Sequence, residues 1–99
     1  MVIKAEFPNT LAMGTPAEVQ VTMMEEGELV EGAEVELEGN MTHAGMEPIF
    51  ADAEEVTPGT YVAELDWTMS GQWLVTVHAT LMDGREVEQT FRNLEVRSQ

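Results

Sequence analysis

The chain has 99 residues, a length typical of one compact domain, and 43% of them are apolar, which is enough to form a core. Nineteen acidic residues against four basic ones give a formal net charge of −15, which repels phosphate backbones and anionic membranes and excludes nucleic acid as a partner. Because there is no cysteine, disulfides, thiolate zinc sites and iron–sulfur clusters are excluded, and any metal must be held by His, Met or carboxylates.

The first half of the chain predicts three strands from the alternation of apolar and polar residues. Residues 2–7 alternate before Pro8-Asn9 and indicate a short edge strand, and residues 18–24 indicate a second, half-buried strand. Residues 33–38 give the cleanest period-two pattern, with three glutamates on one face. We expect Gly39 to end this strand, so that the segment 40–48 forms a loop.

The second half predicts four more strands, separated by turn signals. Residues 48–56 form a weaker candidate, because the helix propensity of an Ala-Asp-Ala-Glu-Glu stretch competes with a strand. Residues 61–67 follow a Pro-Gly turn, and residues 72–82 give the best candidate for a central strand. An Asp-Gly pair returns the chain as residues 85–96, where a slip in phase indicates a bulge near residues 92–93.

These patterns predict an all-β fold, an antiparallel β-sandwich of immunoglobulin-like architecture with about seven strands. We expect a single domain over residues 1–99. No apolar run approaches the length of a transmembrane span and no signal-peptide pattern opens the chain, so we expect no direct membrane insertion in this segment and a mature or excised domain.

Catalysis is not expected from this set of side chains. A hydrolase of the acyl-transfer type needs a nucleophile and a base within reach of each other, and the chain offers only Ser70 and Ser98 with His43 and His78. A general acid needs an apolar setting that raises its pKa, whereas the many glutamates of this chain alternate onto a solvated face. We therefore predict that the protein is not an enzyme.

A compact set of soft donors lies in the segment 40–48. It contains Met41, His43 and Met46, and thioether and imidazole donors suit Cu(I) far better than Mg²⁺ or Ca²⁺. If the chain before Gly45 is extended, Met41 and His43 project to the same side, and a bend at Gly45 returns Met46 toward them. Taken singly, each methionine could instead fill a gap at the end of the core.

A fourth candidate donor is Met69, which lies in the turn between Trp67 and Trp73 rather than on a strand. It could complete the site if this turn and the segment 40–48 lie at the same end of the sandwich. We expect both tryptophans to be core residues, with capping of Cu(I) by one ring through a cation–π interaction as the alternative. Among the remaining candidates, we expect His78 to be a surface residue, Met13 to be a weak extra donor, and Met23, Met24 and Met82 to pack in the core.

Five short segments occur in an order that is similar to a known family. They are EGELVEGAEV, MTHAGMEP, PGTY, WTMSGQW and VTV, and the similarity extends over residues 17–96. In this order they resemble the YtkA-like domain, a small bacterial immunoglobulin-like module related to FixH-type proteins.

The resemblance implies an extracytoplasmic β-sandwich, periplasmic or at the cell surface, that is associated with copper handling. It implies a Cu(I) chaperone or metal-transfer module, with Met41, His43, Met46 and Met69 as the metal donors. A copper transporter or an oxidase-assembly protein is the kind of partner that it implies.

Two other functions remain open at this stage. The main alternative is a metal-free immunoglobulin-like domain for adhesion, spacing or protein interaction, in which the methionines pack and the acidity serves solubility. Calcium binding is a weaker alternative, because the acidic residues are spread along strands rather than gathered at the spacing of a calcium loop.

Overall fold

The computed structural model describes residues 1–43 and 45–98, and within these residues it contains strands and no helix. No element of this part of the chain is a helix of the length and hydropathy needed to span a membrane. The strands are β1 (Val2–Glu6), β2 (Leu11–Ala12), β3 (Ala17–Glu25), β4 (Glu28–Leu29), β5 (Glu34–Met41), β6 (Ile49–Thr57), β7 (Thr60–Leu65), β8 (Gly71–Thr80) and β9 (Glu86–Arg97).

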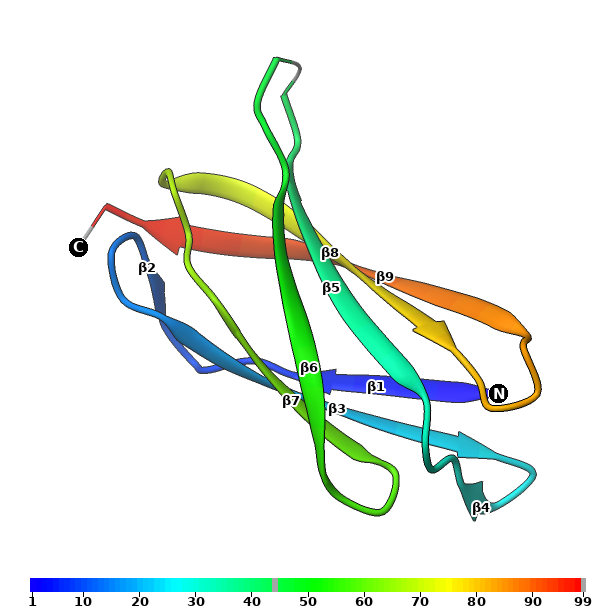
Figure 1. The fold of residues 1–99 in the computed structure, drawn as a ribbon. Helices are drawn as coiled ribbons and strands as arrows, with labels where there is room; N and C mark the ends of the chain where they lie inside the picture. Colours follow the sequence, from blue (N-terminus) through cyan, green and yellow to red (C-terminus); the bar gives the residue numbers. More distant parts are fainter. Residues whose placement is uncertain (44, 99) are drawn as a thin grey trace.

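The strands form a single curled sheet in the order β1-β3-β7-β6-β5-β8-β9-β2, and β4 pairs with β3 (Figure 1). The pairs are antiparallel except for β2 and β9, which are parallel. The predicted all-β, antiparallel architecture is confirmed. The described residues contain nine strands rather than about seven, because β2 and β4 have only two residues each and fall below what an alternation pattern can reveal.

Strand β6 connects the two layers that enclose the core. Its first part, residues 49–53, pairs with β5, whereas residues 54–57 pair with β7. One layer therefore contains β1, β3, β4 and β7, and the other contains β5, β8, β9 and β2. Figure 1 shows β6 running from the projecting β5–β6 hairpin at the top of the view to the β6–β7 turn at the bottom.

Alternation along the strands determines which side chains enter the core. The strands predicted for residues 18–24 and 72–82 are confirmed as β3 and β8, in which alternate residues from Ala17 to Met23 and from Trp73 to Ala79 are buried. Their neighbours face solvent, because successive side chains on a strand point to opposite sides of the sheet. The predicted bulge is also confirmed, because the β8–β9 register shifts opposite residues 91–94 and Asn93 has a φ of 64°.

Two predictions about individual residues are wrong. Gly39 does not end β5, because it pairs with both Ile49 of β6 and Val75 of β8, and these partners on both sides carry the strand on to Met41. Met82 does not pack in the core, because it follows the end of β8 and is 82% exposed.

Candidate metal site

The connection between β5 and β6 comprises residues 42–48, of which Ala44 lies outside the described residues. Figure 1 shows this connection projecting beyond the ends of the other strands. Two of the four predicted donors, His43 and Met46, lie on it. His43 is exposed, and Met46 is half-buried where it packs against the core, so the hairpin side of the candidate site is open to solvent.

Met41 is the last residue of β5 rather than part of the loop, and it is only 8% exposed. It pairs with Trp73 in β8, and the ladder continues one residue further, because the Thr42 amide donates a hydrogen bond to the Gln72 carbonyl at 3.2 Å. The methyl group of Met41 lies close to Gly71: a Cβ placed on this glycine would stand 2.7 Å from the Met41 Cε. The end of the Met41 side chain therefore reaches the first residue of β8.

Met69 lies on the connection between β7 and β8, two residues before Gly71, and is 41% exposed. Its backbone carbonyl accepts a hydrogen bond of 2.9 Å from the indole Nε1 of Trp73. Because Trp73 is also the cross-strand partner of Met41, the β7–β8 connection and the end of β5 lie at the same end of the sheet. The sequence left open whether the turn with Met69 and the segment 40–48 lie at the same end of the fold, and this pairing places them there.

The two tryptophans form part of the core beneath this end of the sheet. Trp67 and Trp73 are 2% and 1% exposed, and their rings meet edge to face with centroids 5.4 Å apart and an interplanar angle of 62°. Their predicted core position is confirmed. Since neither ring presents a face to solvent, an ion would have to enter the core before a ring could cap it.

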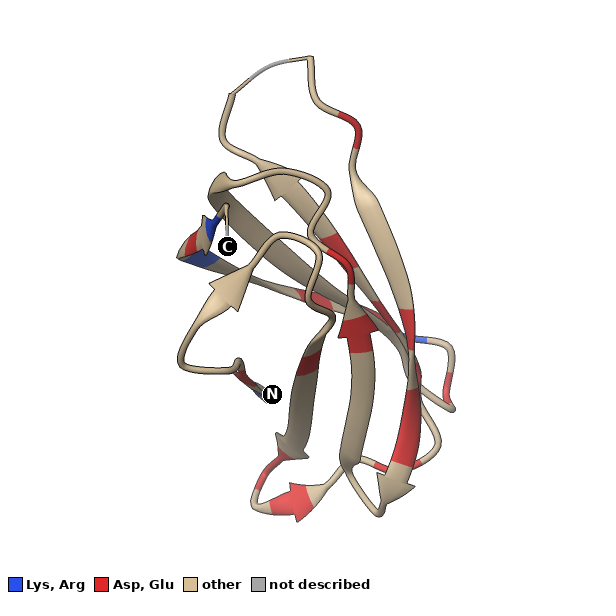
Figure 2. Cartoon of the chain, turned by 90° about the vertical axis from the view of Figure 1, so that its left-hand side faces the viewer, with Lys and Arg blue, Asp and Glu red and all other residues tan. Residues whose placement is uncertain are grey.

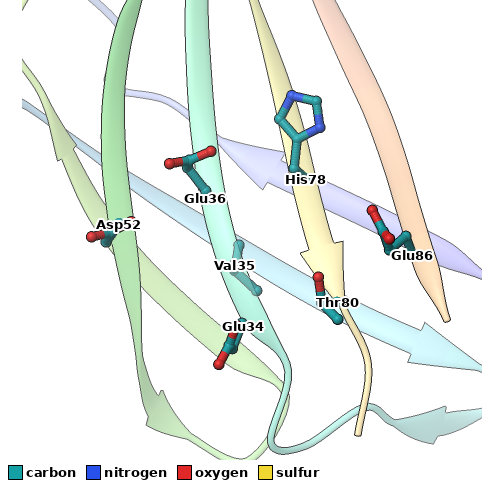
Figure 3. Close-up of a pocket in the computed structure, with 7 residues that line it drawn as sticks. All are labelled: Glu34, Val35, Glu36, Asp52, His78, Thr80 and Glu86. Atoms are coloured by element: carbon teal, nitrogen blue, oxygen red, sulfur yellow. The ribbon is translucent and has the colours of Figure 1, made fainter. Parts of the chain in front are cut away.

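In the described part of the chain, the carboxylates do not form a metal site. A hollow of about 440 Å³ on the outer face of the sheet is lined by Glu34, Glu36, Asp52, His78 and Glu86 among others (Figure 3). Within residues 1–43 and 45–98, however, no three His, Asp or Glu side chains are placed so that they could hold one ion. Figure 2 likewise shows the acidic residues spread over the strands of both layers.

His78 faces outward, as predicted, but it has two partners that the sequence analysis missed. Its Nε2 lies 2.8 Å from Glu38 Oε1 and its Nδ1 lies 3.2 Å from Glu88 Oε2. Hydrogen bonds from Asn40 and His78 lower the pKa of the Glu38 carboxyl. This cluster forms because β8 pairs with both β5 and β9, so that Glu88 faces His78 directly and Glu38 lies diagonally across from it. The sequence could reveal it only if the pairing of these strands were already known.

Comparison with known proteins gives one family. The family model described as YtkA-like matches residues 3–78, a range that includes the β5–β6 hairpin, the β7–β8 connection and all four predicted donors. No match was found among curated proteins.

Proposed function

Because the chain belongs to the YtkA-like family, we propose that it is a copper-binding domain that carries one Cu(I) ion and releases it to a partner. The proposed donors are the thioethers of Met41, Met46 and Met69 and the imidazole of His43. Soft thioether and borderline imidazole ligands favour Cu(I) over ions that require oxygen ligands. The resemblance of the Met/His segment to this family implies the same ion and the same donors. In this proposal the ion lies where the β5–β6 hairpin meets the β7–β8 connection.

The observation that carries this proposal is the contact between Met41 at the end of β5 and Gly71 at the start of β8, two residues after Met69. The Met41 methyl group lies against Gly71, and the Met69 carbonyl is hydrogen-bonded to Trp73, the cross-strand partner of Met41. Two methionines that are far apart in the sequence are thus attached to one pair of adjacent strands. A site between them needs little ordering of the chain when the ion binds, which favours affinity.

Exposure and charge support a transfer role for this site. His43 is exposed and Met69 is 41% exposed, whereas Met41 is 8% exposed, so an incoming ligand could replace the outer donors before the buried one. The proposed ligands are all neutral, and they leave the charge of Cu(I) uncompensated. The net charge of −15 provides a negative field that offsets this charge and speeds the capture of small cations.

The proposal extends to the partner and the compartment. The receiving protein would be a copper transporter or an oxidase-assembly protein, and the domain would act outside the cytoplasm, in the periplasm or at the cell surface. Methionine ligands suit such an oxidising compartment, since they do not form disulfides as cysteine does. Ligand exchange requires no covalent step, so the proposal assigns no enzymatic activity.

The test is an anaerobic titration in which the protein competes for Cu(I) with a chelator of moderate affinity. The variants are Met41→Leu, His43→Ala, Met46→Leu and Met69→Leu, and the matched control is Met82→Leu, which removes an exposed thioether from another part of the molecule. Leucine keeps the volume of methionine, so each Met→Leu variant should lose less than about 1.5 kcal/mol of folding stability.

The proposal predicts that the wild type and the Met82→Leu control withhold Cu(I) from the chelator equally well. Substitution of groups that only orient metal ligands already weakens binding by roughly 10–100-fold, so loss of a donor should weaken it at least tenfold. If the wild type fails to withhold Cu(I), or if all four donor variants bind as the wild type does, the proposed function is wrong.

A second candidate function is a metal-free immunoglobulin-like domain for adhesion, spacing or protein interaction. The observation that favours it is the burial of Met41, because methionine commonly fills irregular gaps in a core. The same titration separates the two candidates. The metal-free alternative requires that the wild type and Met41→Leu both leave the chelator saturated with copper.

A further inference from the structure

Trp73 contacts both segments that carry the methionine donors. Its backbone pairs with Met41 of β5, and its indole Nε1 donates a hydrogen bond of 2.9 Å to the Met69 carbonyl. The side chain is 1% exposed and packs edge to face against Trp67, so the position of the indole ring is fixed by the core. A rigid group therefore holds the backbone of the connection that carries Met69.

Gly71 makes room for the other donor. It has a φ of +135°, a conformation that residues with a side chain rarely adopt, and a Cβ at this position would lie 2.7 Å from the Met41 Cε. That separation is shorter than a normal van der Waals contact between carbon atoms. The missing side chain is what lets the end of Met41 lie against the start of β8, two residues after Met69.

We propose that Gly71 and Trp73 are positioning residues for the copper site, which together hold the thioethers of Met41 and Met69 at one place. This inference rests on the proposed function and adds two residues that are not themselves donors. Groups behind the ligands of a metal site commonly set ligand orientation, and their substitution lowers metal affinity by roughly 10–100-fold. We expect losses in this range when either residue is changed.

The first experiment compares Gly71→Ala with Gly84→Ala in the Cu(I) competition titration. Gly84 has a φ of +91°, also in the region that favours glycine, but a Cβ there would meet nothing within 4 Å. Both variants therefore carry backbone strain, whereas only Gly71→Ala collides with Met41. We expect Gly71→Ala to lose roughly tenfold or more in Cu(I) affinity, and Gly84→Ala to bind as the wild type does.

A double-mutant cycle distinguishes positioning from a general loss of structure. If Gly71→Ala acts by displacing the Met41 thioether, it should cause no further loss of affinity in a protein that already carries Met41→Leu. A purely structural effect would lower the affinity by the same factor in both backgrounds, and this result would overturn the role proposed for Gly71.

The second experiment tests Trp73, and it also serves if Gly71→Ala does not fold. Trp73→Phe is compared with Trp67→Phe, because both rings are buried and both variants remove the same volume. Among the described residues, the Nε1 of Trp67 has no hydrogen-bond partner, whereas that of Trp73 holds the Met69 carbonyl. We expect a larger loss of Cu(I) affinity in Trp73→Phe, by roughly tenfold. Equal affinities of the two variants would overturn the role proposed for Trp73.

The outcomes separate this inference from the proposed function. If the wild type does not bind Cu(I), the proposed function fails and the positioning role fails with it. If the wild type binds and the donor variants do not, while Gly71→Ala and Trp73→Phe match their controls, only the positioning role is wrong.

Discussion

Replacement of Tyr61 by Phe should remove a hydrogen-bonded bridge between β7 and the segment that leads into β5. The Tyr61 side chain is fully buried; its hydroxyl donates to the Val30 carbonyl at 2.8 Å and accepts from the Ala33 amide at 3.1 Å. A buried backbone group that loses its partner costs about 1–3 kcal/mol, and since Val30 and Ala33 are half-buried, water can replace part of the loss. We expect Tyr61→Phe to lower the free energy of unfolding by about 1–2 kcal/mol.

Urea unfolding followed by circular dichroism measures this change. A loss of this size corresponds to a drop in Tm of roughly 5–15 °C for a domain of this length, with an unchanged dependence on urea concentration. Thr76→Val is a suitable control, because it removes a hydroxyl whose hydrogen-bond partner is the Thr90 hydroxyl, at 2.9 Å on the outer face of the sheet. Thr90 can then turn to water, so the control should stay within about 0.5 kcal/mol of the wild type.

The same residue predicts a pH dependence. Burial raises the pKa of the Tyr61 phenol above its ordinary value, so the folded state favours the neutral form. The resulting contribution to stability is complete below the unfolded-state pKa of about 10, and it is lost as the pH rises through the higher folded-state pKa. The wild type should therefore lose more stability in this alkaline range than Tyr61→Phe does. A loss below about 0.5 kcal/mol at neutral pH, or equal alkaline losses in the two proteins, would refute this account of the bridge.

Two other predictions concern the sheet itself. Hydrogen bonds, chiefly the one from Asn40, lower the pKa of the Glu38 carboxyl. The contribution of this carboxylate to stability is therefore present above its unfolded-state pKa of about 4.3, and it is lost as the pH falls through the lower folded-state pKa. Urea unfolding between about pH 6 and pH 3 should show that Glu38→Gln loses less stability than the wild type, and the difference between the two losses should be under about 1 kcal/mol. Parallel losses in the two proteins would count against this interaction. Gly59→Ala should lower the free energy of unfolding by about 2–4 kcal/mol, because the new Cβ would lie 2.8 Å from the Leu29 Cβ and φ is +79°. Gly84→Ala, with strain but open space, should lose only about 1–2 kcal/mol in the same urea titration, and equal losses would show that the Leu29 contact is unimportant.

The strands were predictable where local geometry alone determines the pattern. Alternation of side chains requires only an extended backbone, so the inward face of β8 and the phase slip near Asn93 could be identified from the residues. Gly39 shows where this reasoning fails. Its Cβ would lie 2.8 Å from Ile49 Cγ1, so this glycine allows a close approach within the sheet instead of ending a strand. The sequence offers no means of distinguishing these two uses of glycine.

The candidate site was predictable as a set of residue types but not as an arrangement. The thioether and imidazole side chains are visible in the chain, and so is the position of Met69 between two strand patterns. The placement of Met41 in β5 depends on its pairing with Trp73, and that pairing depends on the register of two strands that are far apart in the sequence. The roles proposed for Gly71 and Trp73 likewise come from contacts across strands, which no local pattern encodes.

The division of β6 between the two layers has a consequence for how the molecule opens. Its amides and carbonyls pair with β5 along residues 49–53 and with β7 along residues 54–57, so neither layer can separate from the other while this strand stays intact. Subglobal openings in proteins follow cooperative units, and a strand shared by both layers joins them into one such unit. The slowest amide hydrogens of β3 and β8 should therefore exchange with solvent through the same global unfolding event. Met41, the proposed donor at the end of β5, would then keep its place in the sheet until the whole fold is lost.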